Sequence, residues 1–357
     1  MRLFFVLLIF VPLSILFHFL HFSKALNFFI SALAIIPLAG FMGRATEEIA
    51  SKKGPTVGGL MNATFGNATE LIIAFIALSR GYIEVVQASI TGSIIGNLLL
   101  VMGASFLAGG LKYKSQPFNK AIVGNGASML TIATIGLVVP AMFAYTCHLD
   151  SRSIAVVHLS EWVAIALLFV YFLGLVFSLH THKNVFCVPD EDAVDECAQM
   201  HWSMGRSLAV LLVTTIFVAI ESELLVDSIH EVTKVLSLTE LFVGIIIVAI
   251  VGNAAEHAAA IVVALKGKAD LSLNISQGSS IQVALFVAPV LVLFGTIVGQ
   301  PMSLVFTPFE VLAVAVSVII STIVSMDGES NWFEGVLLLA VYFILAVAFF
   351  FYRAPGL

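Results

Sequence analysis

The sequence predicts an all-α protein that crosses a membrane many times, and its composition is the first observation behind this prediction. Hydrophobic residues make up 60% of the 357 residues and charged residues only 11%, whereas about 25% of a soluble domain is charged. The mean hydropathy of +1.08 is more than one soluble core could hide. The net charge is −6 and no Lys or Arg stripe is present. Nucleic-acid binding is therefore excluded.

The second observation is a series of apolar runs separated by polar, Gly and Pro residues, each about long enough to cross ~30 Å of hydrocarbon. The first run follows Arg2 as a secretory signal does, but His18 and His21 stand where a cleavage site would lie, so we expect it to be retained. The predicted spans, about eleven in number, are residues 3–21, 25–43, 57–79, 83–109, 120–145, 154–179, 205–228, 238–265, 271–299, 304–325 and 332–352.

The third observation is an internal repeat. Residues 66–70 read Gly-Asn-Ala-Thr-Glu, and residues 252–256, which lie 186 positions later, read Gly-Asn-Ala-Ala-Glu; the same offset relates the Gly-Ser pairs at 92–93 and 278–279. The predicted organisation is an extra N-terminal helix (1–22), two five-helix repeats (25–179 and 205–352) and a linker between them (180–204). Because five is odd, the second repeat is inverted. This plan is typical of secondary transporters, whose site lies near the midplane between the repeats.

The orientation follows from the positive charges. Eleven of the sixteen Lys and Arg residues fall on the N-terminus and on the loops after spans 2, 4, 6, 8 and 10. Positive charge marks the cytoplasmic side. We therefore expect a multi-pass protein of the cell membrane with a cytoplasmic N-terminus and linker and an external C-terminus.

The repeated motifs contain the candidate site. A glutamate inside an apolar helix costs at least about 3 kcal/mol, so it needs a function or a partner. Each glutamate follows a Gly and an Asn that we expect on the same helical face. The candidate ligands are Glu70, Gly66 and Asn67 in span 3 and Glu256, Gly252 and Asn253 in span 8. Their oxygen atoms and charge of −2 suit Ca²⁺; the alternative is two protonated glutamates in polar helix contacts.

Other polar residues supplement this site. A flanking shell of hydroxyl, amide and imidazole groups is expected from Ser93, Asn97, Ser279, Gln282 and His257, although such residues also serve helix packing. An acidic cytoplasmic end of span 2 (Glu47, Glu48) and an acidic outward end of span 7 (Glu221, Glu223, Asp227) are candidate proton or ion paths, with Glu221 and Glu223 expected to lie deeper than Asp227. The linker residues Asp190, Glu191, Asp192, Asp195 and Glu196 form either a Ca²⁺-collecting surface or a solvated tether.

The motifs at 66–73 and 252–257 resemble those of the cation exchanger (Ca²⁺/H⁺ antiporter) family, a branch of the Ca²⁺:cation antiporter superfamily, and the resemblance extends over the whole chain. It implies a transporter of prokaryotic type without enzymatic activity or a cofactor, whose partners are Ca²⁺, protons and the lipid bilayer. It also implies Ca²⁺ ligation by Glu70 and Glu256. Members often carry Gln in both flanking helices, and Gly96 departs from that pattern. A Na⁺/Ca²⁺ exchanger of the same fold and a cation channel are the alternatives, and a homo-oligomer is left open.

Overall fold

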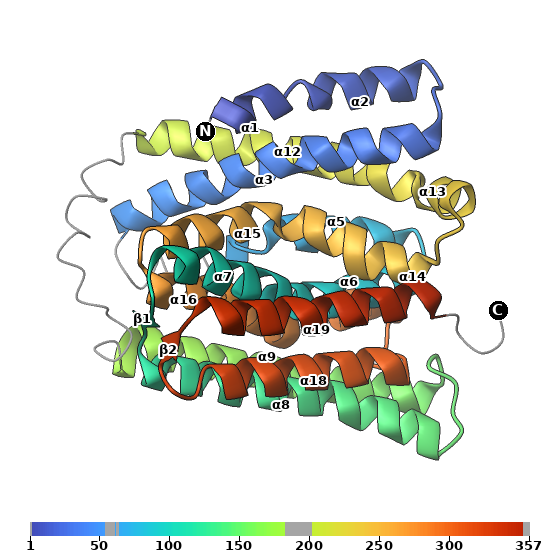
Figure 1. The fold of residues 1–357 in the computed structure, drawn as a ribbon. Coiled ribbons are helices and arrows are strands. Elements are labelled where there is room, and N and C mark those ends of the chain that lie inside the picture. The colour runs from blue at the N-terminus through green and yellow to red at the C-terminus, as the bar shows by residue number, and fades with distance from the viewer. Residues whose placement is uncertain (1, 54–60, 62–63, 183–201, 353–357) are drawn as a thin grey trace.

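The computed structural model describes residues 2–53, 61, 64–182 and 202–352, and over these residues the chain is almost entirely helical (Figure 1). Eight of the described helices or unbroken helix runs are long and apolar enough to cross a membrane: Lys24–Lys53, Ile83–Lys112, Lys120–Thr146, Ile154–Thr181, Met204–Leu236, Glu240–Leu265, Ala269–Ile297 and Trp332–Phe351. Three shorter apolar helices occupy Phe4–Phe19, Ala68–Ser79 and Pro308–Val324. Each predicted span overlaps one of these, so the chain is an all-helical, multi-pass membrane protein.

In the described part of the chain, the elements follow one another as a series of helices with four π-helical turns and two short strands. They are α1 (Arg2–Leu7), α2 (Phe10–Phe19), α3 (Lys24–Lys53), α5 (Ala68–Ser79), α6 (Ile83–Ile95), η1 (Gly96–Val101), α7 (Met102–Lys112), β1 (Gln116–Pro117), α8 (Lys120–Thr146), α9 (Ile154–Val176), η2 (Phe177–Thr181), α12 (Met204–Asp227), α13 (Ile229–Leu236), α14 (Glu240–Phe242), η3 (Val243–Val248), α15 (Ala249–Leu265), α16 (Ala269–Gln282), η4 (Val283–Val287), α17 (Ala288–Ile297), α18 (Pro308–Val324), β2 (Glu329–Ser330) and α19 (Trp332–Phe351).

Several helices begin at residues that cap their free backbone N–H groups. Asn331 accepts hydrogen bonds from the N–H groups of Phe333 and Glu334 at the start of α19, and Glu334 accepts one from the Asn331 N–H. Thr307 and Glu310 form the same reciprocal pair at α18. These capping boxes satisfy N–H groups that a helix leaves unpaired, so they fix where the spans begin.

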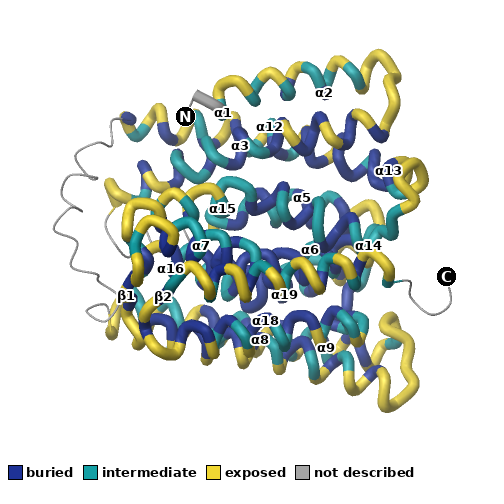
Figure 2. Tube along the Cα trace, in the orientation of Figure 1, coloured by how far each residue is buried: buried dark blue, intermediate teal, exposed yellow. Residues whose placement is uncertain are grey.

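The helices lie side by side in three groups (Figure 1). In the first group α3 packs along α12, and α2 covers both. In the second, α15 contacts α5, α6, α7 and α16, while α19 packs on α7. In the third, α8 packs against α9 and α18. Buried residues gather on the helices in the middle of the bundle (Figure 2), so the central group is where a site is shielded from lipid and water.

Contacts between distant loops identify the two ends of the bundle. The antiparallel strands β1 and β2 pair Gln116 with Ser330 and join the loops after α7 and α18. The Lys112 ammonium group donates a hydrogen bond of 2.8 Å to the Leu265 carbonyl at this same end, which we call the ladder end. Helix α19 runs from the ladder end and finishes at the opposite end (Figure 1).

Three features of the helices differ from the predictions. Helix α3 continues to Lys53, whereas the apolar run predicted an end at residue 43. Residues 45–53 are less apolar than the preceding run but include good helix formers (two Ala, two Glu and two Lys), and Lys52 and Lys53 interact favourably with the C-terminal helix dipole. The first span is broken between α1 and α2, just before Pro12, whose nitrogen cannot donate a helical hydrogen bond. The π-helical turns were not predicted, because they depend on hydrogen-bond register and not on hydropathy.

Candidate functional site: a carboxylate and amide cluster

The two repeated motifs have different backbone conformations. Gly252, Asn253 and Glu256 lie within the continuous helix α15. In contrast, Gly66 and Asn67 lie in a turn, and helix α5 begins only at Ala68. The prediction that both motifs are helical throughout is therefore wrong for the first. Gly is costly in a helix and Asn competes for backbone hydrogen bonds, so the pair ends the helix here. As a result Glu70 lies in the first turn of α5, where the helix dipole favours negative charge.

The side chain of Glu70 rests against α15. A Cβ atom placed on Gly252 would lie only 2.9 Å from Glu70 Cγ, so the absence of a side chain at this position makes room for the glutamate. Glu256 lies four residues after Gly252 on the same face of α15, which places its side chain one turn from the point that Glu70 contacts. Within the described chain, Glu70 Oε1 and Glu256 Oε2 are buried and accept no hydrogen bond. Both carboxyl groups therefore keep an oxygen available for a proton or a cation.

A hydrogen-bonded amide and hydroxyl network surrounds the two glutamates. Asn97 donates to Ser279 Oγ at 2.8 Å and to Asn253 Oδ1 at 3.3 Å. Asn253 Nδ2 in turn donates to Ser93 Oγ at 2.9 Å. The Ser279 hydroxyl lies within hydrogen-bonding distance of Asn253 Oδ1 and of Asn67 Oδ1. Helices α6, α15 and α16 and the start of α5 are thus joined at one point.

Gln282 extends this network from α16, because its Oε1 accepts a hydrogen bond from Asn67 Nδ2. Its counterpart in the other half is Gly96, and the space beside that glycine is open, since no atom lies within 4 Å of a Cβ built there. The departure from the resembled pattern at Gly96 therefore leaves Gln282 without an amide counterpart at the equivalent position. His257 stays outside the hydrogen bonds found among the described residues, and its buried Nε2 has no partner there.

Backbone contact between α6 and η3 closes the bundle next to the cluster. A Cβ atom on Gly92 would collide with the Ile245 carbonyl group, and one on Gly244 would lie 2.9 Å from the Val85 carbonyl oxygen. Such close approach is possible only because both helices present glycine at the crossing. Gly92 directly precedes Ser93, so this crossing also fixes the position of the Ser93 hydroxyl in the amide and hydroxyl network.

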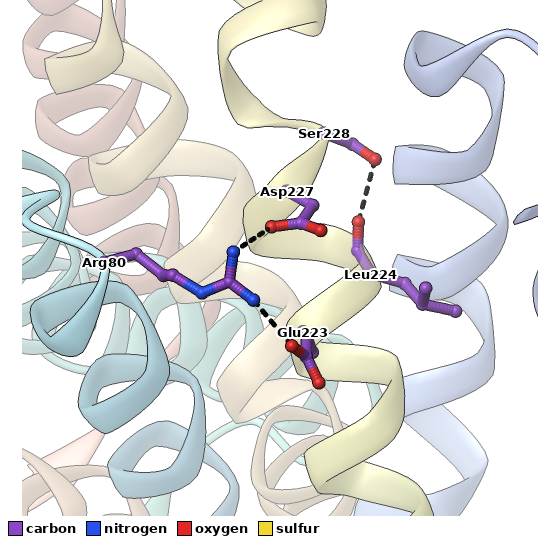
Figure 3. A network of polar contacts seen from close by, with 5 residues as sticks. All are labelled: Arg80, Glu223, Leu224, Asp227 and Ser228. Carbon is purple, nitrogen blue, oxygen red and sulfur yellow. Dashed lines mark hydrogen bonds and ion pairs between the residues drawn. The ribbon is translucent and has the colours of Figure 1, made fainter.

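The acidic residues of α12 divide into two environments. Glu221 is fully buried, and Ser14 Oγ of α2 lies 2.6 Å from its Oε1. Glu223, in contrast, is exposed. Residues two positions apart on a helix point to nearly opposite sides, which explains the difference. Arg80, at the end of α5, bridges Glu223 at 2.6 Å and Asp227 at 2.9 Å (Figure 3).

These ion pairs are expected to tie α5 to α12 with a modest energy. Because all three side chains are at least one-third exposed, their bridges contribute roughly 0–1 kcal/mol each. Arg80→Gln should therefore lower the free energy of unfolding by less than about 2 kcal/mol. A double-mutant cycle with Glu223→Gln, measured by thermal unfolding in detergent, should show that the second substitution costs less when Arg80 is already absent. Strictly additive costs would show that the pair is not coupled.

The acidic residues of α3 and of the linker are placed only in part. Glu47 and Glu48 lie within the last two turns of α3 and not beyond its end, and Glu48 is buried. Asp190, Glu191, Asp192, Asp195 and Glu196 lie outside the described residues. After the linker, the guanidinium groups of Arg44 and Arg206 both lie over the Trp202 ring, 4.9 Å and 4.8 Å from its centroid. This cation–π contact joins the start of α12 to α3.

One buried carboxylate was missed at the sequence level. Glu310 is 2% exposed and accepts a 3.1 Å hydrogen bond from Thr91, one residue before Gly92. It lines a cavity of about 870 Å³ that also contains Glu84, Glu240 and Asp150. The Thr-x-x-Glu spacing at 307–310 was a signal for it, but the same spacing is explained by helix capping.

An all-helical bundle with shielded carboxylates in a network of amides is typical of a multi-pass membrane transporter. The family described as "Sodium/calcium exchanger protein" matches residues 23–180 and 206–351. The chain belongs to this family and, within the Ca²⁺:cation antiporter superfamily, to its Ca²⁺/H⁺ antiporter branch.

Similar proteins cover nearly the whole chain. A Ca²⁺/H⁺ antiporter of Aphanothece halophytica is 51% identical over 361 residues, covering 98% of this chain and 96% of the relative. A Ca²⁺/H⁺ antiporter of Synechocystis is 49% identical, covering 98% of each chain. The crystal structure of the selenium-substituted Ca²⁺/H⁺ antiporter YfkE is 41% identical with a TM-score of 0.84, and the match covers 99% of this chain and all of that one.

Proposed function

We propose that this protein exchanges Ca²⁺ for protons across the cell membrane by alternating access and so exports Ca²⁺ from the cytosol. The observation that carries the proposal is the pairing of Glu70 and Glu256, each with an oxygen that no described residue satisfies, inside the amide network. The relatives described as Ca²⁺/H⁺ antiporters support Ca²⁺ and H⁺ as the two transported ions. The ligands offered to Ca²⁺ are the two carboxylates and the amide oxygens of Asn67 and Asn253.

The two fluxes are coupled because a bare charge of −2 cannot be carried through a shielded site. Two ionised carboxylates in a low dielectric repel each other strongly. Ca²⁺ cancels their charge, and so do protons. The helices therefore change sides only when the site holds Ca²⁺ or protons, which prevents an empty return. Two carboxylates correspond to two H⁺ per Ca²⁺.

We also propose that residues 25–179 and 205–352 are inverted repeats that meet at this site, which makes eleven spans with the extra N-terminal helix. The two stretches matched by the family begin and end within two residues of these bounds. In addition, the π-helical turns η1 and η4 occupy corresponding positions of the two halves, directly at Asn97 and directly after Gln282. π-Helical turns in membrane helices commonly reshape functional sites.

The function is tested by ⁴⁵Ca²⁺ uptake into vesicles that contain the purified protein. A pH gradient should drive uptake, and a Na⁺ gradient of equal size should not. Uptake driven by Na⁺ instead would identify the Na⁺/Ca²⁺ exchanger that is the second candidate. Ca²⁺ flux that needs no counter-ion gradient would indicate a channel, and either result would overturn the proposal.

The orientation of the chain is a separate prediction. Single cysteines at Asp192 and Gly356, both outside the described residues, should be labelled from opposite sides of the membrane, with Asp192 on the cytoplasmic side. The reason is the odd number of proposed spans together with the excess of positive charge on the linker side. Labelling with an impermeant thiol reagent in intact cells and in inverted vesicles measures this. Both cysteines reacting from the same side would show that a span has been miscounted.

A further inference from the structure

A second, smaller cavity lies in the ladder-end half of the bundle. Its volume is about 200 Å³, and it is lined by residues of α8, α9 with η2, and α16. Polar side chains face it from all three: Asn125, Ser178, Asn274, Gln277 and Gln282. It is far larger than the 10–15 Å³ that a single water molecule requires, so it has room for several waters. Apolar residues make up most of its lining, and the polar side chains offer such waters hydrogen-bond partners.

Gln277 indicates what occupies this cavity. Its side chain is only 4% exposed, yet its Nε2 has no hydrogen-bond partner among the described residues. A buried amide N–H left unpaired costs about 1–3 kcal/mol. Its Oε1 points toward α8, where a Cβ on Gly126 would lie 2.8 Å away. The unpaired N–H therefore calls for an acceptor inside the cavity, and water is the acceptor that a cavity of this kind holds.

The cavity shares a residue with the proposed exchange site. Gln282 lines it and also accepts the hydrogen bond from Asn67, which precedes α5 and Glu70. No described residue around this cavity carries a carboxylate, whereas the 870 Å³ cavity has four, from Glu84, Asp150, Glu240 and Glu310. Ca²⁺ prefers carboxylate ligands, and neutral amides attract it much less. Protons move along hydrogen-bonded water without such ligands.

We propose that this amide-lined cavity is a hydrated side pocket through which protons, but not Ca²⁺, reach the exchange site from the ladder end. The inference rests on the proposed Ca²⁺/H⁺ exchange, because it assigns one of the two ions its own route. Gln277 and Gln282 hold the water chain in place. The chain of water molecules ends at Gln282, beside Asn67, so that protons are delivered next to the carboxylate pair.

Accessibility of the pocket is tested with a cysteine at Gly278, where no atom lies within 4 Å of a Cβ position. The native Cys147, Cys187 and Cys197 are first replaced by Ser. A small water-soluble methanethiosulfonate should label Gly278→Cys, and adding Gly126→Leu should slow the labelling at least tenfold by filling the pocket. The matched control is Gly124→Leu on the same helix, which is exposed and outside the pocket and should change nothing. Failure to label folded Gly278→Cys would show that the pocket is dry and would overturn the proposal.

Proton selectivity is tested by modifying the folded Gly278→Cys protein in vesicles, so that misfolding cannot explain the result. After the reagent has reacted, ⁴⁵Ca²⁺ uptake driven by a pH gradient should fall about tenfold. Exchange of ⁴⁵Ca²⁺ for unlabelled Ca²⁺, which moves no protons, should stay within twofold. Equal loss of both, or loss of neither, would overturn a separate proton route. Absence of both kinds of exchange in the unmodified protein would instead reject the proposed function, whereas the labelling result would still report on the pocket.

Discussion

Glu70→Gln and Glu256→Gln are each expected to abolish proton-coupled Ca²⁺ exchange. Each substitution replaces one carboxylate of the site, on α5 or on α15, with a neutral amide of the same shape. The remaining charge of −1 cannot cancel that of Ca²⁺, and Gln can neither take up nor release a proton. The rate of proton-coupled Ca²⁺ exchange should therefore fall at least about a hundredfold, which corresponds to roughly 2.7 kcal/mol. Uptake of ⁴⁵Ca²⁺ into vesicles under a pH gradient measures the loss.

The matched control for these two variants is Glu231→Gln. It makes the same chemical change on α13, where the side chain is exposed and far from the cluster in sequence. It should leave transport unchanged. Thermal unfolding should show that all three variants remain folded, because Gln fills the volume of Glu. If Glu70→Gln or Glu256→Gln kept near-normal exchange, the paired-carboxylate mechanism would be wrong.

Gly92→Val should also reduce exchange at least about tenfold, for a reason of packing. A valine side chain at this position has no room, because its Cβ would occupy the place of the Ile245 carbonyl group. Helices α6 and η3 must then move apart, and overpacking of this kind costs about 1–3 kcal/mol. The displacement also carries Ser93 away from Asn253, to which it is hydrogen bonded at 2.9 Å. The expected result is slower exchange together with a lower unfolding temperature.

Gly124→Val provides the comparison for Gly92→Val. Both changes place a β-branched residue in a helix, but no atom lies within 4 Å of a Cβ at Gly124. Its effect should be limited to the small difference in helix propensity. A normal exchange rate in Gly92→Val would show that the α6–η3 crossing is not tightly closed and would contradict the packing described for it.

The sequence predicted which residues form the cluster better than how they are arranged. The repeated motif singled out Glu70 and Glu256, and the structure places their side chains together; their role as Ca²⁺ ligands stays a prediction. The motif also predicted that Gly, Asn and Glu share one helical face in both copies. This is wrong for the first copy, because the Gly66–Asn67 turn precedes α5. A repeated motif shows which side chains recur at the same spacing along the sequence. It does not report whether the backbone at that spacing remains helical.

The sequence by itself determined the class of protein and the approximate placement of its helices. The reason is that the length and apolarity of each run are local properties, and they decide whether that run can cross the hydrocarbon layer of a bilayer. Only the tertiary structure decided the contacts between residues far apart in the chain. Asn67 meets Gln282, Arg80 meets Glu223 and Asp227, and Thr91 meets Glu310. These pairings depend on which helices cross and at what height, and the crossings are set by small residues such as Gly92 and Gly252 that let backbones and side chains approach.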